Sequence, residues 1–471
     1  MSIISKVEST IYSLTPAQNL ALNQQFTCFH KQSMQIPLYI IVDKHIDFDL
    51  MKKAVNIEIE RNDCLRLRFV RRNMKVKQYF IPKYSVDDIP FCDFSEKSES
   101  EMMEYLSLDA RNPLKFMKGE LFRVKFFRGT DGRSGIYFNV CHLNMDISAI
   151  IIFFKDLIDT YIALQAGAPM PEPLFPYEEY LKSQLYGPVN QKKLDKGETF
   201  LKELFQTGGP SFYAGIDGMR QLNKLRAAKR DLTIRKVPAY APFHDKSKNL
   251  KFHMDEETTE RITEFCSKAG APVQSLIYLG MRTHLSKINE FTPDVTFYIN
   301  INRRATIAEK RMGGCLLHLL PLRTIISEDV TFKEALLQVT DLFFKLIRHS
   351  DLPPNQVFDV LMKAQNHGYV DSTASMLLSC FPANSLILPE GWKCELRGCS
   401  SGVFSYFAYG LVVPNFLAGG MDFYYEYRTH NFTENDIIEL HKNAMEIIKI
   451  GIDNPNITIG ELLRGNLIFA D

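Results

Sequence analysis

The chain has 471 residues, of which 45% are hydrophobic and 24% charged, so it can bury the core of one large domain or of two smaller ones. Its 56 lysines and arginines balance 55 aspartates and glutamates, which gives a formal net charge of +1. Binding to nucleic acid or to an anionic membrane through overall charge needs a basic excess, so the composition argues against both partners.

The cysteines give no sign of a disulfide framework or of a metal site. All nine are scattered, and no pair has CxxC spacing. The closest pair, Cys394 and Cys399, has no histidine nearby to complete a zinc site. The start, MSIISKVEST, lacks the segments of a secretion signal, and the longest apolar run, at 149–154, is too short to span a membrane. We therefore expect a reduced, cytoplasmic protein.

Strand-like and helix-like segments alternate along the chain, which is typical of a mixed α/β fold. The elements predicted for the first part are a strand at 38–42, a helix at 49–60, a hairpin of strands at 65–69 and 76–81, a strand at 134–141 and a helix at 147–164. Gly167 is placed to end the last helix.

The regular pattern breaks down between residues 169 and 242. Prolines are frequent at its start, at positions 169, 171, 173 and 176, and a glycine pair follows at 208 and 209. One helical patch, at 192–205, interrupts a segment that otherwise has the composition of a loop. We interpret the segment as a bridge between two halves of the chain.

Regular structure resumes at Leu250. The elements predicted beyond it are helices at 255–269, 273–288, 332–349 and 433–450 and strands at 295–302 and 421–427. Gly270 is placed to end the first of these helices, and Thr433 and Asp436 suit a capping box at the start of the last.

The segment from Val140 to Ile147, VCHLNMDI, joins an apolar strand to a long apolar helix. His142 is thus expected at the strand end and Asp146 near the helix start, where a carboxylate suits the helix dipole. Backbone N–H groups near a helix start disfavour imidazolium, so His142 should stay neutral, which is the form that a general base needs. The alternative is a structural histidine beside an aspartate that only caps the helix.

The same segment resembles the HHxxxDG signature of condensation domains from nonribosomal peptide synthesis, which is related to the HxxxD motif of chloramphenicol-acetyltransferase-like and alcohol acyltransferases. No GxSxG elbow, P-loop or HExxH helix is present, which argues against hydrolase, nucleotide-phosphate and zinc-protease chemistry. Further segments similar to those of the family follow in the family's order across nearly the whole chain: 12–18 (YSLTPAQ), 61–69 (RNDCLRLRF), 156–161 (DLIDTY), 175–180 (FPYEEY), Arg303-Arg304, Gly314, 320–323 (LPLR) and 425–432 (YEYRTHNF).

The resemblance implies an α/β fold in which two chloramphenicol-acetyltransferase-like halves form a V-shaped pseudo-dimer with a central tunnel. The half with the HxxxD motif would span residues 1–175, the bridge 176–249 and the second half 250–471. The signature is expected in mid-tunnel, with the donor thioester entering from one face and the acceptor from the other. Such a fold needs no second subunit to complete its tunnel, so we expect a monomer.

The implied reaction is acyl transfer, in which an amine or hydroxyl attacks a thioester carbonyl and forms an amide or an ester. His142 matches the family histidine that deprotonates or positions the nucleophile. Asp146 matches a structural aspartate that pairs with an arginine, and both Arg303 and Arg304 are possible partners here. The resemblance implies no cofactor of the chain's own, because the donor brings the phosphopantetheine arm of a carrier protein or CoA.

Three positions depart from the family pattern. Cys141 replaces the first histidine of the signature, whose side chain is largely structural in the family. Ile147 replaces a glycine beside the reacting carbonyl, and it keeps the N–H that would support an oxyanion but adds a side chain that would narrow the tunnel. His318 replaces an asparagine near the LPLR element and is either structural or a second polar group near the site.

The resemblance favours a free-standing condensation enzyme of specialised metabolism. Since the chain has no room for adenylation or carrier domains, its acyl donor would be an acyl or peptidyl carrier protein acting in trans. The basic run at 220–236 could dock such a partner, but a solvated linker is the simpler interpretation. The alternatives are an acyl-CoA-dependent O- or N-acyltransferase of the same fold, a catalytically silent domain that recruits a carrier protein, and an epimerase.

Overall fold

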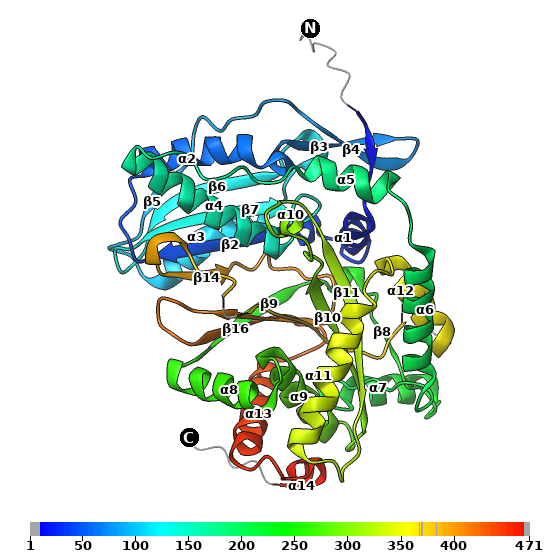
Figure 1. Cartoon of the computed structure of the whole chain (residues 1–471). Coiled ribbons are helices and arrows are strands. Elements are labelled where there is room, and N and C mark those ends of the chain that lie inside the picture. The colour runs from blue at the N-terminus through cyan, green and yellow to red at the C-terminus, as the bar shows by residue number, and fades with distance from the viewer. Residues whose placement is uncertain (1–9, 367, 369–370, 383, 466–471) are drawn as a thin grey trace.

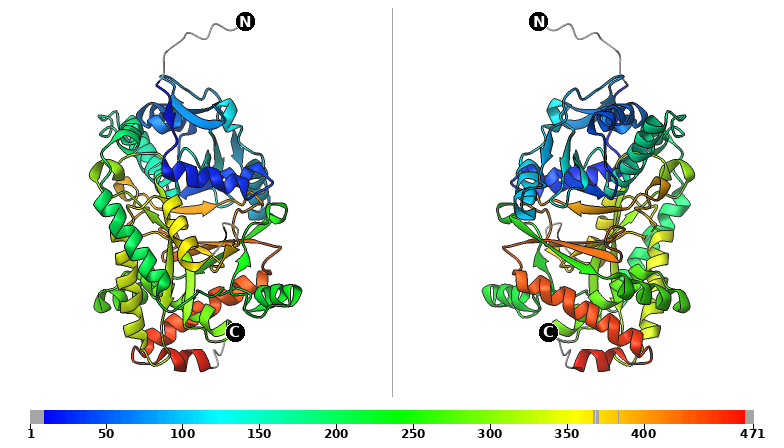
Figure 2. Two further views of the ribbon diagram at one scale, coloured as in Figure 1. Left: turned by 90° about the vertical axis from the view of Figure 1, so that its right-hand side faces the viewer. Right: turned by 90° about the vertical axis from the view of Figure 1, so that its left-hand side faces the viewer.

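The computed structural model describes residues 10–366, 368, 371–382 and 384–465. Two layered halves lie one above the other, the first at the top and the second at the bottom of Figure 1. The side views show the same stacking (Figure 2). None of the helices in the described residues combines the length and hydropathy that a bilayer span requires.

A five-stranded sheet forms the centre of the first half. Its strands, in order across the sheet, are β14 (Cys394–Gly398), β2 (Gln35–Val42), β7 (Ser134–Cys141), β6 (Phe122–Arg128) and β5 (Phe91–Asp93). Neighbouring strands are antiparallel except β5 and β6, which are parallel. A smaller sheet beside it contains β1 (Tyr12–Ser13), β4 (Lys75–Phe80) and β3 (Leu67–Arg72). The strands and the hairpin predicted for this part of the chain are present, with ends shifted by a few residues.

Helix α4 is the central helix of the first half. The helices of this half are α1 (Pro16–Phe26), α2 (Phe48–Arg61), α3 (Glu99–Arg111) and α4 (Ile147–Ala166), with 3₁₀ turns η1 (Lys31–Met34), η2 (Asp63–Arg66) and η3 (Phe116–Lys118). Asp146 caps the start of α4, and Gly167 ends it in the left-handed conformation (φ 61°) that glycine adopts without strain. The predicted helix and its predicted end are therefore confirmed.

A six-stranded sheet forms the centre of the second half. Its strands, in order, are β11 (Leu317–Ile325), β10 (Asp294–Asn302), β13 (Leu377–Cys380), β15 (Ala408–Pro414), β16 (Met421–Arg428) and β9 (Ser247–Met254). The helices of this half are α8 (Glu256–Ala269), α9 (Val273–Ile288), α10 (Ile307–Lys310), α11 (Phe332–Arg348), α12 (Pro354–Gln365), α13 (Glu434–Asp453) and α14 (Ile459–Arg464), with 3₁₀ turns η4 (Pro242–His244) and η5 (Pro389–Gly391). Both predicted strands and all four predicted helices are found among them.

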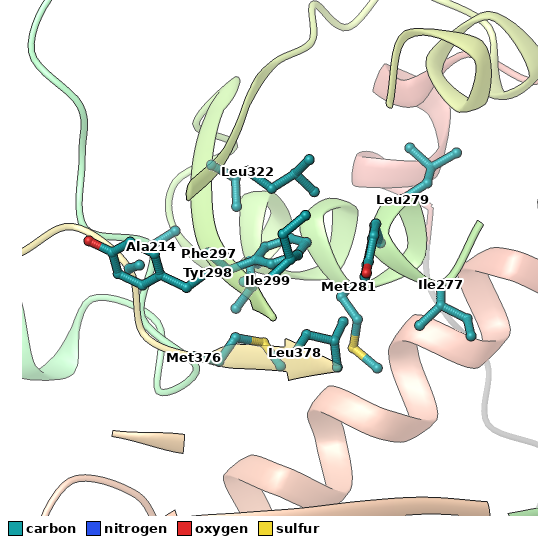
Figure 3. Close-up of a cluster of buried hydrophobic side chains, with 14 of the residues drawn as sticks. Ala214, Ile277, Leu279, Met281, Phe297, Tyr298, Ile299, Leu322, Met376 and Leu378 are labelled. Carbon is teal, nitrogen blue, oxygen red and sulfur yellow. The ribbon is translucent and has the colours of Figure 1, made fainter. Parts of the chain in front are cut away.

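The core of the second half lies between this sheet and α9 (Figure 3). Phe297 and Ile299 of β10, Leu322 of β11, and Leu279 and Met281 of α9 are all fully buried. Burial of each such side chain contributes roughly 1.5–3 kcal/mol to the stability of the fold. This packed layer therefore fixes the positions of β10 and β11, whose other face is turned away from α9.

The bridge contains more helix than the sequence indicated. Its elements are α5 (Tyr177–Tyr186), α6 (Gln191–Gln206), α7 (Arg220–Lys229) and β8 (Val237–Pro238), which pairs with β12 (Asp371–Ser372). The patch predicted at 192–205 corresponds to α6, but α5 and α7 were not predicted. Their apolar faces are narrow: α5 buries only Tyr177 and Leu181, and α7 buries only Leu222. With so few apolar residues, the sequence shows little of the helical periodicity from which a helix is predicted.

Strand β14 connects the two halves. It comes from the second half of the sequence, yet it pairs with β2, so that Leu396 lies opposite Ile40 in the sheet of the first half (Figure 1). The boundaries at 1–175, 176–249 and 250–471 remain a prediction. The structure adds that one strand from beyond residue 250 extends the sheet of the first half.

Candidate active site

A tight turn between β7 and α4 positions the HxxxD segment. The carbonyl of Cys141 accepts a hydrogen bond from the N–H of Asn144 (2.8 Å), and the N–H of His142 donates to the carbonyl of Met34 (2.8 Å). The turn is fixed from outside as well. The Gln18 amide donates to the carbonyl of Leu143 (2.9 Å).

A second anchor comes from η2. The side chain of Asn144 donates to the carbonyl of Cys64 (2.9 Å). Gln18 and Cys64 belong to 12–18 and 61–69, two of the segments through which the sequence resembles condensation domains. Both segments therefore contact the turn that holds His142.

The imidazole of His142 has one nitrogen engaged and one available. Its Nδ1 lies 3.2 Å from the carbonyl oxygen of Met145. A carbonyl can only accept, so Nδ1 carries the proton in the neutral ring and Nε2 presents its lone pair. Burial lowers the pKa of His142 below its usual value, an effect that the charge of Asp146 partly opposes. The ring is therefore neutral and basic at Nε2 near pH 7.

Asp146 joins the two halves of the molecule. Its Oδ1 accepts from the N–H of Ala149 (2.8 Å) and caps α4, while its Oδ2 accepts from Nη1 of Arg304 (2.9 Å) and from the N–H of Leu316 (2.8 Å). Nη2 of Arg304 donates to the carbonyl of Gly314 (2.9 Å). Both side chains of the ion pair are buried.

Two other predicted site residues lie away from this centre. Arg303 forms a partly exposed ion pair with Asp351 (3.0 Å), so the structure pairs Asp146 with Arg304 and not with Arg303. His318 is fully buried and donates from Nε2 to the carbonyl of Leu352 (2.7 Å). Burial lowers the pKa of His318 to about 4, so it is a neutral packing residue.

A cavity of about 370 Å³ lies where the halves meet, and His142 lines it. The first half contributes residues of β2 and the start of α4, including Ile147 and Ser148, and the second half contributes residues of β10, β13, β15 and β16. Ile147 therefore faces the cavity. Cys141 is buried and does not line the cavity, and burial raises the pKa of its thiol to about 12, so this sulfur is an unreactive thiol.

Most of the polar lining from the second half was not predicted from the sequence. It includes Asn300, Ser379, Ser400, Tyr409 and Glu426. These residues occupy single positions in strands or follow a strand. Glu426 lies in the family-like segment at 425–432, but that resemblance did not single it out as a site residue. In the described part of the chain, no group of three histidine, cysteine or acidic side chains could hold a metal ion.

Known proteins are similar to this chain in sequence and in fold. The Condensation domain family model matches residues 8–464. Surfactin synthase subunit 1 of Bacillus subtilis (strain 168) is 23% identical over 473 residues, covering 97% of this chain and 12% of that protein. Gramicidin S synthase 2 of Brevibacillus brevis is 23% identical over 381 residues, covering 77% of this chain and 8% of that protein. The chain thus spans only about a tenth of the length of these relatives.

Solved structures show the same fold. The first condensation domain of the calcium-dependent antibiotic synthetase, in complex with a substrate analogue, superposes with a TM-score of 0.80 at 16% identity, over 98% of this chain and 100% of that one. A mutant of the starter condensation domain of rhizomide synthetase, in complex with C8-CoA, gives 0.77 at 14% identity, over 96% of this chain and 97% of that one. The family match over nearly the whole length shows that the chain belongs to the condensation domain family.

Proposed function

We propose that this chain transfers an acyl group from a phosphopantetheine thioester to an amine or hydroxyl acceptor, forming an amide or an ester in the biosynthesis of a nonribosomal peptide or related metabolite. Condensation domains form amide bonds in such pathways. The observation that supports the proposal most directly is the orientation of His142: Met145 fixes the proton on Nδ1 and leaves Nε2 free at a cavity between the two halves.

In the proposed reaction, Nε2 of His142 orients the acceptor and takes its proton as the acceptor attacks the thioester carbonyl. The new C–N or C–O bond forms, the C–S bond breaks, and the imidazolium returns the proton to the departing thiolate. The N–H groups at the start of α4, beginning with Ile147, offer the positive end of the helix dipole to the oxyanion. Asp146 and Arg304 are positioning residues that hold this turn against the second half.

The proposed donor is an acyl or peptidyl carrier protein acting in trans, which brings the phosphopantetheine arm, and the proposed enzyme is a monomer without a cofactor of its own. The rhizomide synthetase structure contains C8-CoA, and CoA thioesters are therefore the alternative donors to test. We propose the same limits for the parts as the sequence indicates, with the HxxxD half at 1–175, the bridge at 176–249 and the second half at 250–471.

Mass analysis of products tests this function. Panels of acyl-carrier and acyl-CoA thioesters are offered with amine and alcohol acceptors to the wild type, to His142→Ala and to His45→Ala, a control at an exposed histidine. We expect product from the wild type and the control, and a loss of at least about 100-fold in His142→Ala with an unchanged melting curve. Full activity of a folded His142→Ala variant would remove the general-base role.

The second candidate, a catalytically silent domain that recruits a carrier protein, is favoured by one observation: Ile147 faces the cavity where the family has glycine. Ile147→Gly separates the two candidates. If the wild type binds loaded carrier without turnover and Ile147→Gly gains transfer, the side chain blocks the site and the native chain recruits. If the wild type turns over and the variant changes the rate little, the enzyme assignment stands.

A further inference from the structure

Glu426 of β16 lines the cavity and is held on one side only. Its Oε1 accepts hydrogen bonds from the hydroxyls of Ser247 (2.7 Å) and Ser400 (2.9 Å). Its Oε2 accepts none from the described residues, and the residue is half-buried at the cavity wall. One carboxylate oxygen is thus fixed by neutral donors, and the other is left for whatever occupies the cavity.

This carboxylate has no cationic partner among the residues that the structure describes. Among the described residues that line the cavity there is no lysine or arginine, and the other lining carboxylate, Asp146, is neutralised by Arg304. Burial raises the pKa of Glu426 to about 7, since no nearby positive charge offsets it. A half-buried carboxyl without a partner is neutralised either by a proton or by a cation that arrives with the ligand.

The cations closest to Glu426 along the sheet are engaged elsewhere. Lys251 of β9 pairs with Glu395 and with Asp422 (3.0 Å). Arg428, two residues further along β16, donates to the carbonyls of Phe404 (2.8 Å) and Ser405 (2.8 Å). Neither of these two groups is placed to neutralise Glu426, and no ion pair of Glu426 with a described residue is formed, so a cation that neutralises it would arrive with the ligand.

The position of Glu426 separates it from the reacting centre. Gln35 of β2 pairs with Cys141, and the N–H of Cys399 donates to Pro37 on the other side of β2 (2.9 Å). Ser400 and His142 therefore follow strands on opposite sides of β2, two strand spacings apart and offset by two residues along β2. At about 4.8 Å between strands and about 3.4 Å per residue, their backbones lie roughly 12 Å apart. Asp146 is the carboxylate that acts on the pKa of His142, whereas the pKa of Glu426 responds to burial and to its two serines.

Other groups around Glu426 suit an aliphatic ammonium ion. Tyr409 of β15 and Asn249 of β9 lie opposite Glu426 on the neighbouring strands, and both line the cavity. A carboxylate, an aromatic ring and neutral oxygens together satisfy an ammonium head and its methylene stem. Because a reacting nitrogen must come within hydrogen-bond reach of Nε2 of His142, the cation at Glu426 is a different group of the substrate.

We propose that Glu426 is a specificity-determining residue that binds the protonated amino group of a substrate side chain, so that the enzyme acts on a thioester of a basic amino acid such as lysine. The inference rests on the proposed acyl transfer and adds the class of its substrate. The reacting group remains at His142, and the side-chain ammonium lies at Glu426 between Ser247 and Ser400.

Binding of two matched probes tests the inference. Lysyl- and norleucyl-aminopantetheine, in which a stable amide replaces the thioester, have the same α-amine and differ in the side-chain ammonium. Calorimetric titration at pH 8 should show the lysyl probe binding wild type at least about tenfold more tightly. The preference should shrink at pH 6, where Glu426 is protonated, disappear in Glu426→Gln, and persist in Glu264→Gln, a control at an exposed glutamate of α8.

Equal affinity of the wild type for the two probes would overturn the inference, and this comparison needs no variant to fold. A lysyl preference that persists in Glu426→Gln would overturn it too. Equal weakening of both probes in that variant would place the α-amine at Glu426 instead. Because binding is measured without turnover, a lysyl preference without transfer would reject the proposed reaction but keep the subsite. Where transfer occurs, fragmentation of the product shows whether the lysyl group entered as donor or acceptor.

Discussion

At the scale of single residues, one backbone carbonyl sets the chemistry of His142. The Met145 oxygen fixes the proton on Nδ1, and burial disfavours the charged ring. The two effects act together, because a neutral ring with the opposite tautomer would turn its N–H toward the cavity and could not accept a proton there. The turn between β7 and α4 thus selects both the charge and the orientation of the proposed base.

The pH dependence of transfer follows from this burial. A histidine with a lowered pKa remains a base below pH 6.5, so kcat/KM should fall as pH decreases through a midpoint below that value. The substrate should have a neutral side chain, because a basic one would add the titration of Glu426. A midpoint above 6.5 would contradict a buried, neutral His142.

The two adjacent arginines provide a matched pair for stability. Arg304→Ala leaves the buried carboxylate of Asp146 without its partner, which should destabilise the fold by roughly 3–5 kcal/mol. Arg303→Ala breaks a partly exposed pair with Asp351 and should cost less than about 1 kcal/mol. Urea denaturation of the two variants measures the difference, and equal costs would show that the Asp146 pair is not the buried link.

The sequence located part of this site but not all of it. His142 and Asp146 stand out because a motif connects a strand to a helix. The choice between Arg303 and Arg304 depends on the backbone just after β10, where the side chain of Asn302 accepts from the N–H of Arg304 (3.0 Å) and holds it inward. Glu426 lies in the family-like segment at 425–432, but the sequence did not single it out, because its environment is assembled from β9, β16 and the segment after β14.

At the scale of elements, local signals were sufficient for the long helices. Thr433 and Asp436 form the expected capping box at α13. Strand β14 was missed because its apolar–polar alternation, in CELRG, covers only four residues before a glycine. Its partner β2 is more than 300 residues away in sequence. Pairing between strands so far apart in sequence depends on tertiary packing, and the local sequence pattern carries no information about it.

Leu396 tests the contribution of β14. It is buried in the core of the first half although it comes from the second. Leu396→Ala should destabilise the protein by about 2–5 kcal/mol through lost burial and a cavity. Ile387→Ala, at an exposed residue of the same segment, should change stability by less than about 0.5 kcal/mol. Similar melting temperatures for the two variants would show that β14 contributes little to the fold.

At the scale of the whole molecule, β15 couples the two cores. Ala408 and Val412 pack in the core of the second half, while Leu411 and Val413, on the opposite face, pack in the core of the first. The six-stranded sheet is therefore buried on both faces along this strand. Together with β14 and the Asp146–Arg304 pair, this packing gives neither half a complete core of its own.

We therefore expect the halves to unfold in one transition. Trp392, the one tryptophan of the sequence, packs edge-on against Tyr161 of α4 (ring centroids 5.9 Å apart), so its fluorescence reports on the junction. Far-ultraviolet circular dichroism reports on the whole chain. The two probes should give coincident thermal midpoints. Two separated transitions would mean that the halves are independent domains.

The strand exchange has a consequence for recombination between related condensation domains. A chimaera joined at the bridge would take β2 and β7 from one parent and β14 from the other, and so place a foreign edge strand beside the sheet that supports His142. Leu396 and Ile40 would then come from different parents. A functional chimaera would require crossover points that take residues 394–398 from the same parent as the first half. All strands of the first sheet would then come from one parent, although β14 lies late in the chain.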